Sequence, residues 1–468
     1  MSEDIKKPGN ADTFSSVLSP TLIEWAETQA GGTLTALDRH VARREAYIAH
    51  FNSPEGDKLQ SFLRLDRHPV PGSNVSLERE ARICMALENT DIPVPGVTAW
   101  NAQHHIALFE RVAGRADIDK LTDASMQRIV MEDFIDAIAR LHLLDPASLA
   151  LNEVLGSHAL SPSQCALDDL EGQLAQFDKF VANYHDPLLH YGVAWLRRFA
   201  PTEVARVSLV QGDTGPVNFM FDGQGAKAHV SAIVDWEWGH WGDPMEDLGN
   251  ICVREFWNPS GGLKGLFERY SQRSGIPYDA NAVRYYRVQQ NVRGMIPIHA
   301  VCQTRGMRES LAWYLAYREV GDRATCEALA DAMNIAIEKP DLPAYEKPRD
   351  PLTDAALTGL SRDLAPELSS EFAQSRVRDI AILIECQDRI RRFEPEMQAQ
   401  EISEIAKLLS SAPTDIEKSN LALRNAIESQ SLPDETLIPY LARRAYRREW
   451  LFWPAATLYP DRTWSAID

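Results

Sequence analysis

Two short apolar segments, each followed directly by polar residues, constrain this chain more than any other feature. Val207-Ser208-Leu209-Val210 leads into Gln211-Gly212-Asp213-Thr214-Gly215-Pro216-Val217-Asn218, and Val230-Ser231-Ala232-Ile233-Val234 leads into Asp235-Trp236-Glu237. Apolar runs of this length are typical of buried strands. The pattern therefore predicts two strands that end in short, rigid loops, where functional side chains are commonly held.

The polar residues of these two segments fit phosphoryl transfer from a nucleotide. Asp213 is suited to accept the proton of an attacking hydroxyl. Asn218 and Asp235 supply one neutral and one charged oxygen, which are hard donors for Mg²⁺. The Asp-x4-Asn spacing alone occurs by chance, and its weight comes from the flanking strands, the second Asp and the later Gly242-Asp243-Pro244 run. We therefore interpret the chain as a kinase of a small molecule.

Length and charge limit the architecture and the partners. A chain of 468 residues is too long for one compact core and predicts two or three domains. Its formal charge of −19 disfavours nucleic acid or an anionic membrane as the main partner. The six cysteines are dispersed, the N-terminus is polar, and the sequence shows no long apolar segment. We therefore expect a cytoplasmic protein without disulfides or a membrane span.

The order of the patterns predicts an α+β fold with a small mixed lobe before a larger helical one. We expect a flexible tail at 1–19, the mixed lobe at 20–114, the helical lobe with the motif strands at 115–338, a proline-rich linker at 339–352 and a helical C-terminal domain at 353–468. Within the first lobe, alternation predicts a strand at 45–51, a hairpin turn at 54–57 leads into a second strand at 59–65, and an apolar run predicts a buried strand at 106–112. An amphipathic helix is expected at 77–87.

The C-terminal domain is expected either to form a homodimer or to cover the larger lobe. Apolar stripes from Val377 to Phe393 and from Ile402 to Leu409 predict its helices. Four arginines, at 443, 444, 447 and 448, precede Trp450-Leu451-Phe452-Trp453. They suit either a basic helix face packed onto the domain, which is the favoured interpretation, or a docking surface for a partner.

The motifs together resemble those of the aminoglycoside phosphotransferase-like (choline kinase-like) small-molecule kinases, which share the protein kinase fold. The resemblance covers about residues 20–338 and is strongest at 211–218, 234–237 and 242–248. Weaker support comes from residues 91–95, from Glu110-Arg111-Val112-Ala113-Gly114 and from Leu141-His142. The resemblance implies a bilobal fold, ATP as co-substrate, Mg²⁺ as cofactor and a small-molecule hydroxyl as acceptor.

The resemblance also implies roles in the catalytic loop. Asp213 corresponds to the catalytic residue that receives the proton of the acceptor, and Asn218 and Asp235 correspond to the metal ligands. Asp247 corresponds to the buried carboxylate that braces the loop backbone. Gln211 stands where the family usually has histidine, and an amide is able to make the same orienting hydrogen bond.

Further residues are expected around the nucleotide. They are Arg64, Glu80, Gly31, Gly32, Glu110, Arg111 and Val112. Arg64 stands in place of the usual lysine, and its planar fork is suited to grip phosphate oxygens. Glu80, on the following helix, is the expected ion-pair partner, and the alternative is an exposed strand cation with a solvated helix acid. The two glycines would form the glycine-rich loop, and segment 110–112 would form the hinge that meets adenine.

Other assignments keep an alternative. Glu237 suits either a carboxylate behind the metal or a surface position. Arg293 and His299 suit either the acceptor pocket or ordinary buried hydrogen bonds, and the latter is favoured. The rival function is a nucleotide-binding pseudokinase, which is supported by the unusual residues Gln211 and Arg64. A third possibility, a metal-dependent hydrolase, would need further His and carboxylate ligands. The sequence does not identify the acceptor, which could be a metabolite, a hydroxy acid or an antibiotic. It also does not distinguish ATP from another nucleoside triphosphate.

Overall fold

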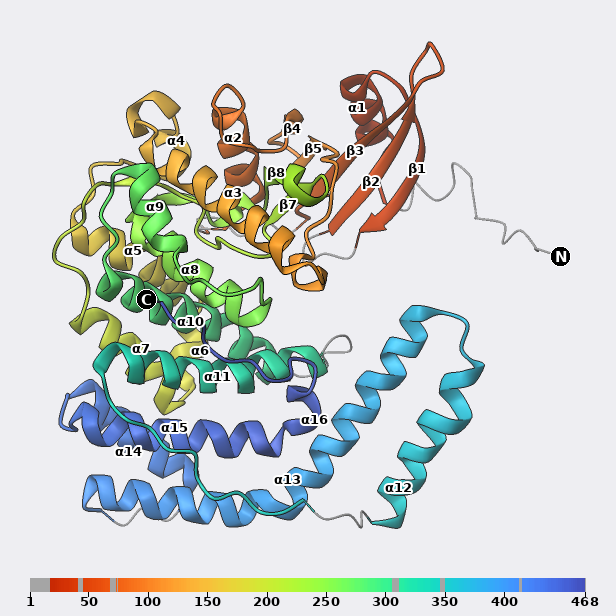
Figure 1. Cartoon of the computed structure of the whole chain (residues 1–468). Coiled ribbons are helices and arrows are strands. Elements are labelled where there is room, and N and C mark those ends of the chain that lie inside the picture. Colours follow the sequence, from red (N-terminus) through yellow and green to blue (C-terminus); the bar gives the residue numbers. More distant parts are fainter. Residues whose placement is uncertain are drawn as a thin grey trace. The chain divides into compact units, whose positions relative to one another are not determined.

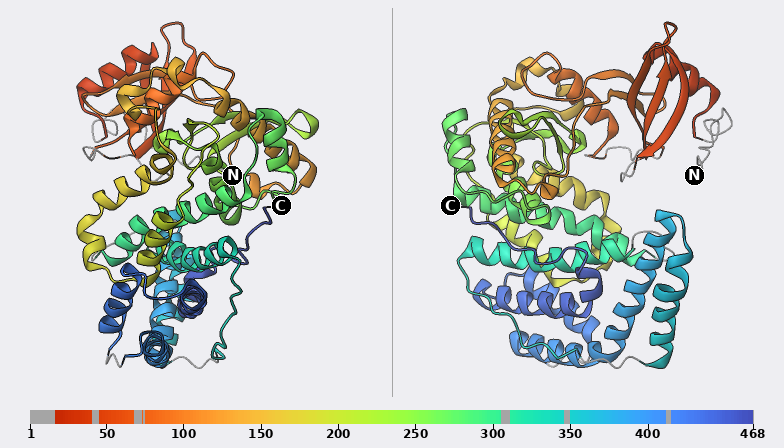
Figure 2. Two further views of the ribbon diagram at one scale, coloured as in Figure 1. Left: turned by 90° about the vertical axis from the view of Figure 1, so that its left-hand side faces the viewer. Right: turned by 45° about the vertical axis from the view of Figure 1, so that its right-hand side comes forward.

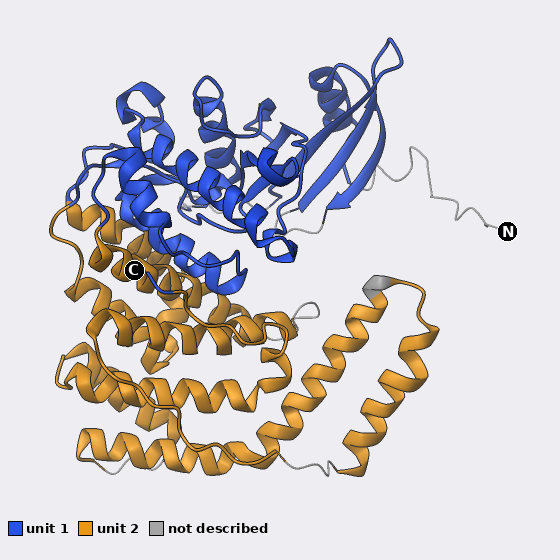
Figure 3. Cartoon of the chain, in the orientation of Figure 1, with its two compact units in different colours: residues 1–161, 204–278, 466–468 blue, residues 162–203, 279–465 orange. Residues whose placement is uncertain are grey.

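The chain forms two compact units, which Figure 3 distinguishes by colour. The computed structural model describes residues 17–40, 45–67, 73, 75–304, 311–345, 350–411 and 415–467. Unit 1 comprises residues 1–161, 204–278 and 466–468, and unit 2 comprises residues 162–203 and 279–465. The chain thus leaves unit 1 after residue 161 and returns to it just before the motif strands.

Unit 1 begins with a five-stranded antiparallel sheet in the order β1-β2-β3-β5-β4 (Figures 1 and 2). The strands are β1 (Thr33–His40), β2 (Glu45–Asn52), β3 (Lys58–Leu65), β4 (Val97–Asn101) and β5 (Ile106–Glu110). The three predicted strands of this region are β2, β3 and β5. The sequence did not reveal β1 and β4, because edge strands are half-exposed and their polar residues interrupt the alternation.

The two faces of this sheet have different neighbours. Alternate residues of a strand point to opposite faces. Leu63 and Leu65 of β3 belong to the apolar core that packs against α1 (Pro20–Ala30), whereas Phe62 and Arg64 line a cavity on the other side. The sheet therefore holds Arg64 in place through the packing of its neighbours in the same strand.

The rest of unit 1 includes helices and two short two-stranded sheets. The helices are α2 (Leu77–Leu87), α3 (Ala124–Leu143), α4 (Asn152–Leu155), α8 (Pro244–Trp257) and α9 (Leu266–Ser274). The strands are β6 (Ser208–Val210), β7 (Phe219–Asp222), β8 (His229–Ile233) and β9 (His240–Gly242), with β6 paired to β9 and β7 paired to β8. The predicted motif strands are β6 and β8, and the predicted helix at 77–87 is α2. The sheet with its helices confirms the α+β class.

The regular elements of unit 2 are all helices in its described residues. Its helices are α5 (Pro162–Gln176), α6 (Asp178–Asn183), α7 (Pro187–Arg198), α10 (Ala280–Gln303), α11 (Leu311–Met333), α12 (Pro351–Thr358), α13 (Glu371–Leu409), α14 (Ile416–Glu428), α15 (Asp434–Leu451) and α16 (Trp453–Ala456). Leu315 and Ala316 of α11 share an apolar core with Met397, Leu451 and Ala455. The segment 353–468 therefore groups with earlier helices rather than standing as a unit of its own. This division differs from the predicted boundaries at 114, 338 and 352.

Two predicted segments fall partly outside the described residues. The expected tail at 1–19 includes residues 1–16, and the expected linker at 339–352 includes residues 346–349, neither of which the structure describes. In the described part of the chain, no helix combines the length and the hydropathy needed to cross a bilayer.

The C-terminal arginines make ion pairs inside unit 2. Arg443 and Arg447 pair with Glu404, Arg444 pairs with Asp186 and Glu401, and Arg448 pairs with Glu319. The guanidinium carbon of Arg389 lies 4.0 Å from the ring centre of Trp450, and Phe393 meets the same ring edge-on. These contacts support the packing interpretation of this basic and aromatic segment, while the expected homodimer stays a prediction.

Candidate active site

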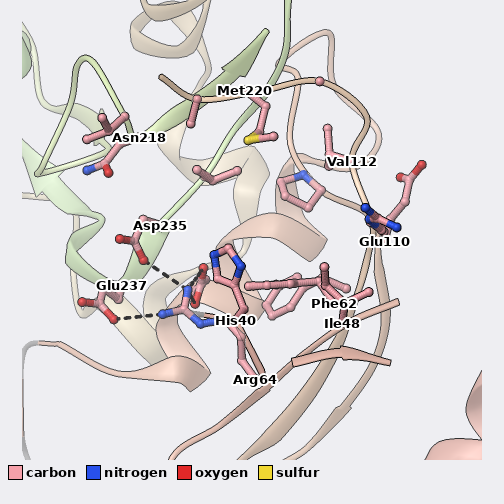
Figure 4. Close-up of a pocket in the computed structure, with 18 residues that line it drawn as sticks. His40, Ile48, Phe62, Arg64, Glu110, Val112, Asn218, Met220, Asp235 and Glu237 are labelled. Atoms are coloured by element: carbon pink, nitrogen blue, oxygen red, sulfur yellow. Dashed lines mark hydrogen bonds and ion pairs between the residues drawn. The ribbon is translucent and has the colours of Figure 1, made fainter. Parts of the chain in front are cut away.

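A cavity of about 470 Å³ in unit 1 brings together most of the predicted site residues (Figure 4). It is lined by His40, Ile48, Phe62, Arg64, Glu80, Pro95, Phe109, Glu110, Arg111, Val112, Gly114, Ala116, Val217, Asn218, Met220, Val234, Asp235 and Glu237. Its volume is in the range of small-molecule sites in proteins. The lining includes the predicted ion pair, the predicted hinge segment and both predicted metal ligands.

Arg64 lies among three carboxylates. Its Nη1 is 2.5 and 2.6 Å from the two carboxylate oxygens of Glu80 and 3.1 Å from Oδ1 of Asp235. Its Nη2 is 3.6 Å from Oε2 of Glu237. Burial opposes the charge of Arg64, but the three carboxylates outweigh it and raise the pKa of the guanidinium. The structure thus shows a buried ion pair with Glu80 rather than an exposed cation.

Three carboxylates surround the guanidinium of Arg64, and they differ in their exposure. Glu237 is 2% exposed and therefore does not occupy a surface position. The side chain of Asp235 is 40% exposed and borders the cavity, as Figure 4 shows. Asp235 is thus the most exposed of the three carboxylates around Arg64 and is open to the cavity.

Asn218 connects the cavity with Asp213. Its Nδ2 donates to the carbonyl oxygen of Asp213 at 2.6 Å and to Oδ2 of Asp213 at 3.0 Å. Because the amide nitrogen donates to Asp213, the amide oxygen is oriented away from that donor contact and is suited to accept or coordinate. Asp213 itself does not line the cavity.

Asp213 is also bound by Arg254, which the sequence analysis missed. Arg254 Nε donates to Oδ1 of Asp213 at 2.9 Å, and its Nη2 donates to Oδ2. Arg254 follows Asp247 by seven residues on α8, so the two lie on one face of the helix. The seven-residue spacing between Asp247 and Arg254 is the feature of the sequence that could have placed Arg254 near the catalytic loop.

Asp247 accepts hydrogen bonds from the catalytic loop. Its carboxylate accepts from the backbone N–H groups of Gln211 at 2.9 Å and Gly212 at 3.0 Å. It also accepts from the Thr214 hydroxyl and, at 3.0 Å, from Nε2 of His142. Burial acts to raise the pKa of Asp247, but the hydrogen bonds, led by that of His142, outweigh it and hold this pKa below its usual range. The geometry suits the bracing role that the resemblance implied.

Gln211 ties the two motif segments together. Its Nε2 donates to the carbonyl oxygens of Val234 at 3.0 Å and Asp235 at 2.9 Å, and its Oε1 accepts from the backbone N–H of Asp213 at 2.8 Å. An amide is able to donate and accept at the same time. Glutamine in place of the usual histidine therefore keeps an orienting link between the catalytic loop and the metal-ligand segment.

The backbone around the site adopts unusual conformations. Asp235 has φ 63°, and Val217 has φ 72° although it is β-branched. Such a conformation costs a β-branched residue about 1–3 kcal/mol and persists where the surrounding structure enforces it. Gly215, with φ 137°, lies so close to α8 that a Cβ there would be 2.6 Å from Cβ of Arg254. The loop is thus held in a strained, closely packed form.

The structure corrects the expectation for Gly31 and Gly32, which lie at the α1–β1 turn and do not line the cavity. Gly31 ends α1 in the left-handed conformation, with φ 69° and its N–H bonded to the carbonyl of Glu27. A Cβ on Gly32 would lie 2.6 Å from the carbonyl oxygen of Asn52 in β2. The pair therefore serves the turn and the close approach of two strands. Residues 41–44, which connect β1 and β2, lie outside the described residues.

Arg293 and His299 belong to unit 2 and have buried polar partners there. Arg293 donates to Asp169 at 2.7 Å, and His299 contacts Asp322 at 2.8 Å and the hydroxyl of Tyr184 at 3.0 Å. Both side chains are 2% exposed or less. These contacts support the favoured interpretation as structural polar residues.

Comparison with known proteins finds a matching family and a similar fold. Residues 53–285 match the family model described as "Phosphotransferase enzyme family". A solved structure from Ralstonia eutropha, described as an aminoglycoside phosphotransferase, has a TM-score of 0.50 and 21% sequence identity, and covers 66% of this chain and 96% of that chain. At this identity the likeness concerns the fold, and it confirms the kinase-like architecture.

Two curated mammalian proteins match about half of the chain. Acyl-CoA dehydrogenase family member 11 of Rattus norvegicus is 24% identical over 247 residues, which are 49% of this chain and 30% of the rat protein. Acyl-CoA dehydrogenase family member 10 of Mus musculus is 26% identical over 233 residues, which are 48% of this chain and 21% of the mouse protein. The likeness thus concerns less than a third of each relative. The family match and the fold together show that this chain carries, at residues 53–285, a domain of the phosphotransferase enzyme family.

Proposed function

We propose that the chain is a Mg²⁺- and ATP-dependent kinase that transfers the γ-phosphoryl group to a hydroxyl of a small molecule. One observation supports this most directly: Arg64, Asn218 and Asp235 meet at one cavity, and Asn218 is bonded to Asp213. Phosphoryl transfer needs this combination of a phosphate-binding cation, metal ligands and a hydroxyl-orienting carboxylate.

The cavity offers a place for the nucleotide. Ile48, Phe62 and Met220 give it apolar walls, and the segment 110–112 at the end of β5 borders it (Figure 4). Apolar walls beside a strand end suit a flat base, because stacking surface and backbone hydrogen-bonding groups are then both within reach. The guanidinium of Arg64 would bind the phosphates, with Glu80 fixing its orientation.

Asn218 and Asp235 fit Mg²⁺. An amide oxygen and a carboxylate are hard donors, and Mg²⁺ commonly takes one or two protein oxygens together with phosphate and water. The described residues contain no group of three or more His, Cys, Asp or Glu side chains that could hold a metal, which suits an ion shared with the nucleotide. When bound, the ion would neutralise charge on the phosphates.

Asp213 would orient the acceptor hydroxyl and receive its proton. The hydroxyl oxygen bonds to the γ-phosphorus, the bond from this phosphorus to the β–γ bridging oxygen breaks, and ADP leaves with the electron pair. The transition state is loose, so orientation matters more than strong basicity. The contacts from Asn218 and Arg254 hold the Asp213 carboxylate for this task.

The acceptor class is best sought among the chemistries that the relatives suggest. The name of the Ralstonia protein refers to aminoglycosides, and the names of the mammalian relatives refer to acyl-CoA compounds. A panel of aminoglycosides, hydroxy acids and hydroxyacyl thioesters covers both, and sugars and amino alcohols extend it.

The test uses the full chain, MgCl₂ and ATP labelled at the γ-phosphate. We expect one acceptor class to become labelled, and we expect Asp213→Asn to slow labelling by about 10²–10⁴-fold while a fluorescent ATP analogue still binds. Asp222→Asn is the matched control, because Asp222 is an exposed carboxylate at the end of β7. Its labelling rate should equal that of the wild type.

Two results would contradict the proposal. Binding of Mg·ATP without transfer to any acceptor or to water would favour the nucleotide-binding pseudokinase. Transfer that persists at full rate in Asp213→Asn would place the chemistry elsewhere in the molecule.

A further inference from the structure

One face of α8 binds the catalytic loop through two charged residues. Asp247 accepts hydrogen bonds from the loop backbone at Gln211 and Gly212. Arg254, two helical turns further on, donates to the side chain of Asp213. The same helix face therefore holds both the backbone of the loop and its reactive carboxylate.

The contact between Arg254 and Asp213 engages both carboxylate oxygens. Nε meets Oδ1 at 2.9 Å, Nη2 meets Oδ2, and Asn218 Nδ2 approaches Oδ2 from another side at 3.0 Å. A two-point contact of this kind fixes the rotation of the carboxylate as well as its position. The side chains of Arg254 and Asp213 are only 23% and 14% exposed, so water screens the pair less than it screens a surface pair.

Close packing fixes the loop against the stem of this arginine. A Cβ on Gly215 would lie 2.6 Å from Cβ of Arg254 and 3.3 Å from Cα of Ile251. The loop backbone therefore rests directly on α8. Asp213 and Arg254 are held in register by the backbone of the loop and the helix as well as by their own ion pair.

We propose that Arg254 is a positioning residue for phosphoryl transfer, which holds the Asp213 carboxylate in the orientation that meets the acceptor hydroxyl. The inference rests on the proposed function. Because the reaction depends on orientation more than on basicity, a carboxylate free to rotate would lower kcat. A cation that only balanced the charge of a neighbouring acid would affect stability instead.

The test measures ADP release from Mg·ATP by the full chain, with water as acceptor and with any acceptor found in the labelling screen. Binding of a fluorescent ATP analogue is measured in parallel. Arg254→Gln should lower kcat by roughly 10²-fold. Its Kd for the analogue should stay within about twofold, because Arg254 acts on Asp213 and not on the nucleotide. Arg273→Gln is the matched control, since Arg273 is an exposed arginine on α9 of the same unit.

Three further readouts separate positioning from general support of the fold. Arg254→Lys keeps the charge without the two-point fork, and should give an intermediate kcat. Added guanidinium should recover part of the activity of Arg254→Ala. The double variant Asp213→Asn/Arg254→Gln should be no slower than Asp213→Asn, because Arg254 acts through the carboxylate that is already lost.

The outcomes separate this inference from the proposed function. An unchanged kcat in Arg254→Gln, or a further loss when this change is added to Asp213→Asn, overturns the inference and leaves the proposed function standing. A wild-type chain that binds the analogue but releases no ADP removes both. If Arg254→Gln loses analogue binding through misfolding, Arg254→Lys and the guanidinium experiment decide.

Discussion

Replacing Asp247 by asparagine would remove an acceptor where four donors converge. Oδ2 accepts from the backbone N–H of Gln211 and from Nε2 of His142, and Oδ1 accepts from the backbone N–H of Gly212 and the hydroxyl of Thr214. Asparagine has the same shape but only one oxygen. Its NH₂ group would then face two of these donors.

The loss of stability in Asp247→Asn depends on which of the four donors can become acceptors. The Thr214 hydroxyl is free to rotate and His142 is able to move its proton to Nδ1, so each is able to become an acceptor. A backbone N–H has no such freedom, so one backbone group, of Gln211 or of Gly212, loses its partner in either orientation of the amide. An unsatisfied buried donor costs about 1–3 kcal/mol, and the remaining bonds lose their charge assistance. We expect Asp247→Asn to destabilise unit 1 by about 2–5 kcal/mol.

Two measurements check this value. Urea unfolding followed by tryptophan fluorescence gives the loss of stability, since Trp236 and Trp241 are buried in unit 1. Hydrogen exchange of peptides covering residues 207–222 gives the local effect, and a loss of 2 kcal/mol corresponds to roughly 30-fold faster exchange of protected amides. Asp222→Asn, at an exposed position, should stay within about 0.5 kcal/mol of the wild type.

An unchanged urea midpoint together with unchanged exchange at 207–222 in Asp247→Asn would refute this reasoning. The four hydrogen bonds would then contribute no more to the loop than a neutral amide does.

Three other predictions concern the same site. Because the pKa of Asp247 is lowered in the folded state, its contribution to stability is complete above the unfolded pKa near 3.8 and is lost as the pH falls through the lower folded pKa. When the free energy of unfolding is measured against pH in acid, this pH-dependent contribution should be absent from Asp247→Asn. Gly215→Ala should lower the stability by about 1–3 kcal/mol and slow turnover, because φ 137° and the contact with Cβ of Arg254 leave no room for a methyl group. Thermal unfolding measures the first effect, and ADP-release kinetics measure the second. Asp235→Asn should weaken Mg·ATP binding by at least about tenfold, and EDTA should weaken binding to the wild type in the same way. The thermal shift that Mg·ATP produces measures both effects, and equal shifts with and without Mg²⁺ would contradict the proposed metal role.

Local sequence predicted the elements that have a clear apolar pattern. β2, β3, β5, β6, β8 and α2 fall at or close to the predicted positions. β1 and β4 lie at the edges of the sheet, where polar residues interrupt the pattern, and the sequence did not reveal them. The grouping of α11 with the C-terminal helices depends on contacts between distant segments, and no local pattern reports it.

The residues of the site also differ in whether local sequence was enough to predict them. Asp213, Asn218 and Asp235 were found because their chemistry appears within short segments at strand ends. The prediction for Gly31 and Gly32 was wrong, because a glycine pair serves a turn or a close contact as readily as a phosphate loop.

The reactive groups and the short strands that carry them are apparent in the amino-acid sequence, because spacing along a strand and its following loop is a local property. How these groups are charged and held depends on the tertiary structure. It placed Arg64 among Glu80, Asp235 and Glu237, and it set Arg254 against Asp213 from a helix about forty residues away. Ion pairs and hydrogen bonds between distant segments depend on the packing of the whole unit, and packing is not encoded in any single stretch of the chain.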